Sequence, residues 1–198
     1  MLFCWTRKQA STSRSGTSEL TALIVPALDT DADELAVVAA RTFPLACPPE
    51  AAADDIAAFV AANLSAARFT AYLGDPRRVI LTARHDDRIT GYAMIIRGEK
   101  IESAELSKIY LMPQYHGDGT AAALLQQALA MATEWTASSV WLGVNQKNER
   151  AQRFYAKHGF EVTGTRTSRV GSRLEHDYVM ERDSASAGMR ERQVRPSR

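Results

Sequence analysis

Two glycines and the residues around them carry the clearest chemical signal in the sequence. Gly117 and Gly119 follow the apolar, strand-like stretch Ala104–Met112 and precede a run with helical spacing. Glycine lets the backbone come close to a ligand and adopt angles that other residues avoid. The first amides of a helix have no partner within it, and the helix dipole adds partial positive charge there. The pattern predicts a cradle for a phosphate or diphosphate, although a tight turn that needs glycine for its geometry alone would also produce it.

Residues 117–122 also satisfy the pattern GxGxxG/A, which is a fingerprint of dinucleotide-binding enzymes. That fold requires an acidic residue about 20 positions later, at the end of the next strand, to hold the ribose. Here the next apolar strand, Val140–Val144, runs into Asn145, and most of the chain precedes the glycines. A nucleotide-binding oxidoreductase is therefore kept as the weaker alternative. A Walker phosphate loop is excluded because no Gly-Lys-Ser/Thr follows.

Composition narrows the classes of protein that remain. The chain has 198 residues, a formal net charge of +1, 45% hydrophobic residues and 24% charged residues, which is typical of a globular protein with a real core. Near-neutral charge argues against a dedicated nucleic-acid-binding protein, and no uninterrupted apolar run approaches the ~18 residues of a membrane-spanning helix. The two cysteines form no CxxC and the four histidines are scattered, so we expect no bound metal and a reduced, cytoplasmic setting.

Helical and strand periods alternate along the chain and place the glycine segment in a larger fold. Their sum is an α/β or α+β sheet with helices on its faces. One folded domain is expected over residues 19–182, between a disordered tail of residues 1–18 and an arginine-containing disordered tail of residues 183–198. Strands are expected at residues 20–26, 79–83, 89–96, 104–112, 140–144, 160–169 and 176–180, and helices at residues 29–39, around 56–60, 66–73, 121–132 and 151–158.

A second group of residues follows the strand expected at residues 140–144. In it an asparagine is followed three positions later by an alanine, then by Phe-Tyr and then by Gly-Phe. Two motifs in this order, with a strand between them, resemble the Gcn5-related N-acetyltransferases (GNAT), whose acetyl-CoA loop has the pattern Gln/Arg-x-x-Gly-x-Gly/Ala. The matching residues are His116, Gly117, Asp118, Gly119, Thr120 and Ala121 in the first motif and Asn148, Ala151, Phe154, Tyr155, Gly159 and Phe160 in the second.

Two positions depart from the family pattern. His116 stands where the family has Gln or Arg, and Asp118 stands where it often has Lys or Arg. A carboxylate near a diphosphate is repelled by about 1 kcal/mol at about 4 Å in water. We therefore expect weaker affinity for the coenzyme rather than a different coenzyme, with Asp118 pointing outward and backbone amides doing most of the binding.

The resemblance, which covers residues 20–182, implies a fold and a coenzyme site. The fold is a mixed, mostly antiparallel sheet with splayed central strands and flanking helices. The splayed strands would be Ala104–Met112 and Val140–Val144, and they would admit the pantetheine arm of acetyl-CoA, the expected co-substrate. Backbone groups of Ile109 and Leu111 would bind pantetheine and polarise the thioester carbonyl. The implied coenzyme-binding residues are Ile109, Leu111, His116, Gly117, Asp118, Gly119, Thr120, Ala121 and Asn148.

Two side chains are expected to move protons. An alkylamine with a pKa near ~10.4 is almost entirely protonated at pH 7, so a base must take its proton, and an acid assists the leaving thiolate. The resemblance implies that Glu105 is the base and Tyr155 the acid. The residues alone leave three alternatives open: a paired strand carboxylate for Glu105, a core tyrosine for Tyr155 and a helix N-cap for Asn148.

The predicted function is that of an acetyl-CoA-dependent N-acetyltransferase, in which a small-molecule primary amine attacks directly within a ternary complex. Residues 105–111, 141–144 and 176–180 resemble the bacterial spermidine/spermine N-acetyltransferase branch, so a polyamine is one candidate acceptor. Its site is expected between residues 43–55 and the strand of Glu105. A non-catalytic acyl-CoA-binding sensor is the other alternative. A homodimer is left open, and no nucleic-acid or membrane partner is expected.

Overall fold

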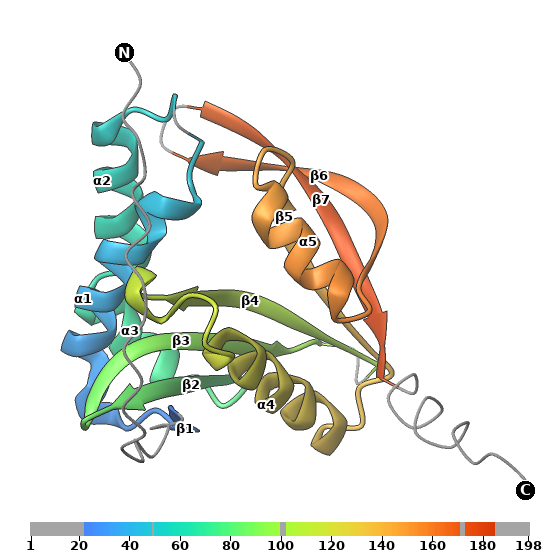
Figure 1. The fold of residues 1–198 in the computed structure, drawn as a ribbon, viewed down its shortest axis with the longest axis horizontal. Helices are drawn as coiled ribbons and strands as arrows, with labels where there is room; N and C mark the ends of the chain where they lie inside the picture. The colour runs from blue at the N-terminus through green and yellow to red at the C-terminus, as the bar shows by residue number, and fades with distance from the viewer. Residues whose placement is uncertain (1–21, 49, 100–101, 171–172, 185–198) are drawn as a thin grey trace, which may run out of the picture.

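A seven-stranded sheet forms the centre of the protein, and helices cover both of its faces (Figure 1). The computed structural model describes residues 22–48, 50–99, 102–170 and 173–184. The strands are β1 (Leu23–Pro26), β2 (Arg78–His85), β3 (Arg88–Arg97), β4 (Ser103–Leu111), β5 (Ser139–Asn145), β6 (Glu161–Val170) and β7 (Arg173–Asp183). The helices are α1 (Ala32–Thr42), α2 (Ala53–Asn63), α3 (Ala66–Leu73), α4 (Thr120–Glu134) and α5 (Glu149–Lys157), with 3₁₀ turns η1 (Asp29–Asp31), η2 (Phe43–Ala46) and η3 (Pro113–Tyr115).

The sheet has the strand order β1-β2-β3-β4-β5-β7-β6. Within the part of the chain that the structure describes, β4 and β5 are the one parallel pair, and all other neighbouring strands are antiparallel. This confirms the mixed, mostly antiparallel sheet that the resemblance implied. It excludes the nucleotide-binding oxidoreductase, whose doubly wound fold has a mostly parallel sheet.

The helices and strands predicted from the sequence are all present, with ends that differ by a few residues. The first predicted helix begins differently, because Asp29–Asp31 form a 3₁₀ turn ahead of α1. Residues 1–18 and 185–198, which hold almost all of the two predicted tails, lie outside the described residues. Asp183, placed in the second tail by the sequence, is the last residue of β7.

The two central strands separate soon after they begin. Ser103–Glu105 of β4 pair with Ser139–Trp141 of β5, and the pairing ends there. Beyond this point the strands diverge in a V (Figure 1). Their backbone groups on the inner sides of the V therefore have no partner strand, which is the splay that the resemblance implied.

A bulge in β4 decides which of its side chains lie on which face of the sheet. Leu106 and Lys108 pair with consecutive residues of β3, which leaves Ser107 between them without a partner. An extra residue reverses the alternation of the side chains that follow, so Lys108 and Tyr110 lie on the same face as Glu105. Leu106 packs in the cluster beneath α4, whereas Tyr110 packs in the cluster beneath α1 and α3.

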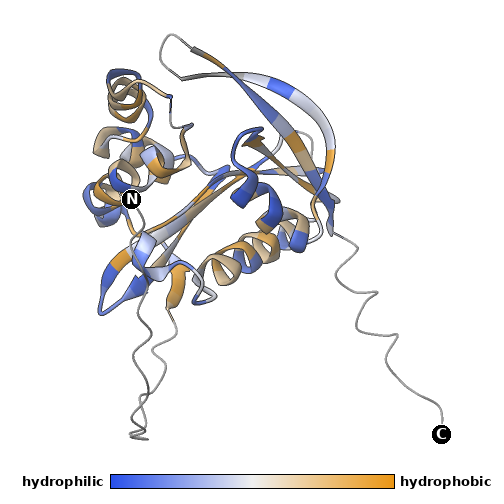
Figure 2. Ribbon diagram, turned by 45° about the horizontal axis from the view of Figure 1, so that its top comes forward, coloured by the Kyte–Doolittle hydropathy of each residue, from blue (hydrophilic) through white to orange (hydrophobic). Residues whose placement is uncertain are grey.

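These two hydrophobic clusters lie on opposite faces of the sheet. On one face α4 packs through Leu124 and Leu125, and on the other α1 and α3 pack through Leu35 and Phe69. Helix α5 adds Tyr155 to the α4 cluster, although most of its residues are hydrophilic (Figure 2). Helix α5 contacts the core through few apolar residues. The packing of Tyr155 in this cluster therefore holds its side chain in place.

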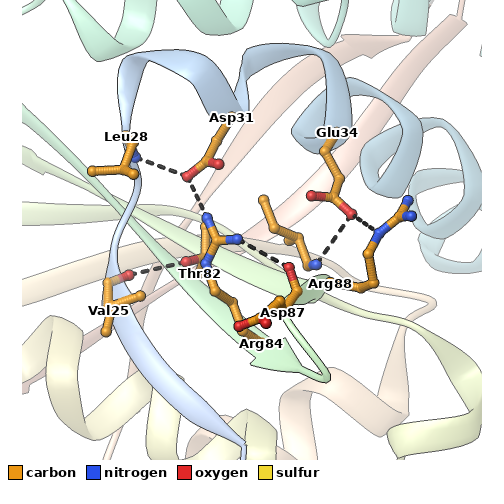
Figure 3. Close-up of polar contacts among 9 residues, drawn as sticks. Val25, Leu28, Asp31, Glu34, Thr82, Arg84, Asp87 and Arg88 are labelled. Atoms are coloured by element: carbon orange, nitrogen blue, oxygen red, sulfur yellow. Dashed lines mark hydrogen bonds and ion pairs between the residues drawn. The ribbon is translucent and has the colours of Figure 1, made fainter.

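A network of ion pairs holds the start of α1 against the β2–β3 hairpin (Figure 3). The carboxylate of Asp31 accepts hydrogen bonds from Arg84 at 2.6 Å and from the amide of Leu28 at 2.8 Å. Glu34 accepts a bond from Arg88 at 2.6 Å. The side chains of Asp31 and Arg84 are only 9% and 18% exposed, so water screens their attraction weakly. The network orients α1, which continues through η2 into the functional site.

One described stretch, Ala53–Leu73, has the length and composition of a membrane-crossing helix. Its mean hydropathy is 1.3. In the fold it forms two helices, α2 and α3, which are interrupted at Leu64 and Ser65. Phe69 and Tyr72 of α3 are buried against the sheet, so this segment contributes to the protein core.

Candidate active site

A groove follows β4 where it has separated from β5, and reaches the starts of α4 and α5. Its volume is about 190 Å³. We call it the coenzyme groove, because five of the nine predicted coenzyme-binding residues line it and the other four form the loop between His116 and Ala121. It is lined by Thr42, Leu45, Ala46, Ile109, Tyr110, Leu111, His116, Ala121, Asn148, Arg150, Ala151, Phe154 and Tyr155.

The glycine loop leaves open space beside the start of α4. Gly117 and Gly119 have φ angles of 95° and 94°, in the left-handed region that is strained for other residues. A Cβ atom at either position would meet no atom within 4 Å. Glycine is therefore required for the backbone angle. The free space lies at the positive end of α4, where the sequence predicts that a diphosphate binds.

Asp118 is exposed, and its side chain also bonds to the start of α4. Its Oδ1 atom accepts a hydrogen bond from the amide of Thr120 at 2.9 Å. The reason is local, because the first amide of the helix has no intrahelical partner and an aspartate two residues earlier can reach it. One of the amides predicted to bind the diphosphate is thus already occupied. Among the described residues, the amides of Ala121 and Ala122 have no hydrogen-bond partner and can still donate.

The backbone of β4 presents unpaired groups to the gap. The amide of Met112 donates to the carbonyl of Thr90 on β3 at 2.8 Å. Because backbone groups of successive strand residues point to opposite sides, those of Ile109 and Leu111 point toward the gap. The Nε2 atom of His116 lies 2.9 Å from the Leu111 carbonyl oxygen. The ring of His116 is therefore bonded to the strand, and the amides of Ile109 and Leu111 face the groove.

A second cavity, of about 280 Å³, adjoins the coenzyme groove and shares six lining residues with it. One wall is the connection from η2 to α2, as the sequence predicted for the acceptor, and the other walls come from β4, β5, β6 and β7. We call it the acceptor cavity. Its lining includes the aromatic residues Phe43, Phe59 and Tyr110, and the polar or titratable residues Cys47, Ser107, Lys108, Asn145, Arg166, Glu175 and Asp177.

Tyr155 lines both the coenzyme groove and the acceptor cavity. It is 8% exposed, and its ring packs edge-on against Phe154 and Phe160, with centroid distances of 5.4 and 5.8 Å. Its hydroxyl group makes no hydrogen bond within the described part of the chain. Burial, reinforced by Tyr110, raises the pKa of Tyr155 well above its usual range. The hydroxyl therefore stays protonated at neutral pH, which is the state that a general acid needs.

Among the described residues, two carboxylates that the sequence did not single out line the acceptor cavity. Glu105 lies where β4 and β5 are still paired, and it lines neither cavity. Glu175 and Asp177 of β7 line the acceptor cavity and are 8% and 7% exposed. Asp177 is 3.4 Å from Arg166, and Glu175 accepts a hydrogen bond from Asn145 at 3.1 Å. The base role of Glu105 stays a prediction.

Sequence reasoning missed Glu175 and Asp177, although a signal was present. Residues two apart on a strand share a face, so both carboxylates point to the same side of β7. The sequence did not show which strand lies beside β7. The order β5-β7-β6 places β7 next to β5, and so next to the gap.

Two further residues complete the site. The Oδ1 atom of Asn148 accepts a hydrogen bond from the amide of Ala151 at 3.1 Å, which confirms the N-cap, and Asn148 also lines both cavities. The thiol of Cys47 donates to the carbonyl of Phe43. Burial, together with Glu175, raises the pKa of Cys47, so the thiol is a poor nucleophile.

Known proteins with similar sequences are N-acetyltransferases. Residues 43–160 match the acetyltransferase (GNAT) family. An uncharacterized N-acetyltransferase of Mycobacterium tuberculosis is 68% identical over 154 residues, which are 78% of this chain and 98% of that protein. The peptidyl-lysine N-acetyltransferase YjaB of Escherichia coli is 35% identical over 78 residues, which are 39% of this chain and 46% of that protein.

A solved structure gives the same result for the fold. The PaiA N-acetyltransferase of Thermoplasma acidophilum, in complex with coenzyme A, has a TM-score of 0.71 at 20% identity and covers 82% of this chain and 99% of its own. The family match covers more than half of the sequence, and the groove and glycine loop lie where the family motifs fall. The chain therefore belongs to the GNAT acetyltransferase family and is an N-acetyltransferase that uses acetyl-CoA as its co-substrate.

Proposed function

We propose that the enzyme transfers the acetyl group directly from acetyl-CoA to a small-molecule primary amine within a ternary complex. The observation that supports this is the meeting of the coenzyme groove and the acceptor cavity at Tyr155. The residues that line both are Ala46, Ile109, Tyr110, Asn148, Ala151 and Tyr155. A thioester reaching this junction from one side would be open to an amine from the other, so no covalent enzyme intermediate is needed.

In this proposal the chain's own groups act on opposite ends of the reaction. The amine nitrogen forms a bond to the acetyl carbon, and the carbon–sulfur bond breaks. The amide of Ile109 polarises the carbonyl oxygen, and the Tyr155 hydroxyl gives its proton to the departing sulfur. The ammonium form of the amine is attracted to Glu175 and Asp177, where it can lose its proton; Glu105 is the rival base. Cys47 takes no part, since its thiol stays protonated.

The identity of the amine stays open within this proposal. A polyamine is one candidate, because its ammonium groups would suit the two carboxylates of β7. A cytoplasmic location also remains a proposal, supported by the free thiol of Cys47.

The test is a thiol-release assay with acetyl-CoA and a panel of polyamines, aminoglycosides, amino acids and short peptides. We expect at least one amine to release coenzyme A, with product mass increased by one acetyl group. Initial velocities measured at several concentrations of both substrates should give intersecting double-reciprocal lines. Parallel lines would contradict direct transfer, and acetyl-CoA binding without turnover on any amine would favour the sensor alternative.

A further inference from the structure

Three cationic side chains surround the ring of Tyr72, which packs in the same hydrophobic cluster as Tyr110 of the acceptor cavity. The guanidinium carbons of Arg68 and Arg78 lie 5.1 and 5.0 Å from the ring centroid, and the ammonium nitrogen of Lys108 lies 5.4 Å from it. The ring cannot neutralise them, because a cation–π contact leaves the charge in place. The Tyr72 hydroxyl is also occupied, since it donates to the carbonyl of Asn63 and accepts from Arg68.

The carboxylates near this cluster do not balance its charge. Asp75 accepts a hydrogen bond from Arg78 at 2.8 Å. Glu105 is near enough to attract Lys108, but within the described residues Lys108 and Arg68 form no ion pair at 4 Å or less. The cluster therefore has an excess of positive charge next to a partly buried lysine.

Lys108 connects this cluster to the acceptor cavity, which it lines. The bulge at Ser107 places the side chain of Lys108 on the same face of β4 as Tyr110, which lies at the junction of the two cavities. Burial lowers the pKa of Lys108 to about 8; Glu105 opposes this and the two arginines add to it. An anion beside the ammonium of Lys108 would offset the free-energy cost of burying that charge, whereas a second cation would increase the cost.

The opposite wall of the cavity has a net negative charge. Glu175 and Asp177 are buried on β7, in the same cavity as Lys108, and Arg166, which lies 3.4 Å from Asp177, offsets one of the two charges. We propose that the acceptor is an amine that also carries an anionic group such as a carboxylate, with the anion held by Lys108 and the amine directed toward the β7 carboxylates and Tyr155. This inference rests on the proposed function and specifies its substrate class. It makes an unsubstituted polyamine a poor acceptor, because its additional ammonium group would meet Lys108.

The experiment compares two series of amines on the same enzyme. One series is ω-amino carboxylates with two to eight methylene groups, and the other is the alkylamines of equal length without the carboxylate. For the unmodified protein we expect kcat/KM to pass through a maximum with chain length in the first series and to exceed the matched alkylamine by about 10-fold or more, the usual effect of one hydrogen bond to a charged group. Spermidine and spermine are measured alongside.

The variant Lys108→Met keeps most of the stem and removes the charge. It should remove the preference for the amino carboxylates by raising their KM, while the alkylamine values change by less than about 2-fold. Arg77→Gln is the matched control, because Arg77 is a half-exposed neighbour that does not contact the Tyr72 ring. Thermal unfolding verifies that both variants fold, and the comparison in the unmodified protein stands without them.

The outcomes separate the two proposals. Equal kcat/KM for amino carboxylates and alkylamines, or a polyamine as the best acceptor, would overturn this inference and leave the acetyl transfer to amines intact. A loss of activity in Lys108→Met that is the same for both series would assign Lys108 a structural role and also overturn it. If no amine of either series is acetylated, this inference fails, whereas the proposed function fails only if the wider amine panel also gives no turnover.

Discussion

The carboxylate of Asp118 and the amide of Thr120 are joined by a 2.9 Å hydrogen bond at the N-terminus of α4. This bond places a negative charge inside the loop that should bind the diphosphate of acetyl-CoA. It also occupies the first free amide of the helix. The loop geometry favours an anionic ligand, while its own aspartate competes for the same donors and repels the same charge.

Replacing Asp118 by Asn should therefore tighten coenzyme binding. The amide oxygen of Asn can still accept the bond from Thr120, so the loop conformation is kept while the charge is lost. We expect the Kd of coenzyme A to fall about 5-fold, which corresponds to about 1 kcal/mol of repulsion removed. Calorimetric titration at low and physiological salt measures this, and the gain should shrink as salt increases. Asp33→Asn removes the same charge from the exposed face of α1 and should leave Kd unchanged; equal or weaker binding by Asp118→Asn would contradict the prediction.

Removing the hydroxyl of Tyr155 should affect turnover and spare binding. In Tyr155→Phe the ring can still pack against Phe154 and Phe160, so the Kd of coenzyme A and the thermal midpoint should change little. We expect kcat to fall about 100-fold, because general acid catalysis contributes roughly that much or more. The measurement is steady-state thiol release with the best amine. A kcat within 3-fold of the unmodified enzyme would show that Tyr155 is only a core residue.

Two carboxylate variants separate the rival bases. Asp177 lines the acceptor cavity and Glu105 does not, so Asp177→Asn should lower kcat/KM for the amine by about 10-fold or more, while Glu105→Gln should have a smaller effect. The Kd of coenzyme A should be unchanged in both, as titration would verify. A larger loss in Glu105→Gln, together with a changed pH profile of kcat, would support the role predicted for Glu105 from the sequence.

The Asp31–Arg84 pair should make stability depend on pH in acid. Burial by itself raises the pKa of Asp31, but Arg84 and the amide of Leu28 lower it more, so it lies below its usual value of 3.8. A group with a lowered folded-state pKa stabilises the fold above its unfolded-state pKa, and this contribution is lost as pH falls through the folded-state pKa.

Asp31→Asn should thus cost about 2 kcal/mol at pH 7, between the values for exposed and fully buried pairs, and the difference should shrink as pH falls below the unfolded-state pKa of about 3.9. Urea unfolding at several pH values measures it. Arg153→Gln breaks the exposed pair with Glu149 and should cost less than about 0.5 kcal/mol at every pH. A difference for Asp31→Asn that does not vary with pH would contradict the linkage.

Removing the hydroxyl of Tyr92 should stabilise the protein. Tyr92 is fully buried, and its hydroxyl has no hydrogen-bond partner in the described structure. Burial raises the pKa of this phenol well above its usual range, so it remains neutral. In Tyr92→Phe a desolvated polar group is lost and the ring contacts with Phe69 and Tyr110 are kept. We expect a gain of about 1 kcal/mol, or about 2–4 °C in Tm by calorimetry. A lower Tm would indicate that the hydroxyl has a partner after all.

The sequence by itself determined the features that depend on a few neighbouring residues. The order strand, glycine turn, helix predicted the loop, and the left-handed angles of Gly117 and Gly119 confirm why glycine stands there. The cap formed by Asn148 at the start of α5 followed from a similar local rule. Such features are predictable because backbone strain and unpaired helix amides act within one or two turns of the chain.

The tertiary structure alone decided which side chains share the acceptor cavity. Lys108 turns toward it because Ser107 bulges out of β4, and Glu175 and Asp177 reach it because β7 lies beside β5. The bond from the Thr120 amide to the exposed Asp118 was also not predicted from the sequence. The physical reason is that strand order, bulges and burial depend on contacts between residues far apart in the chain. The charge environment of each group is therefore fixed only when the sheet has formed.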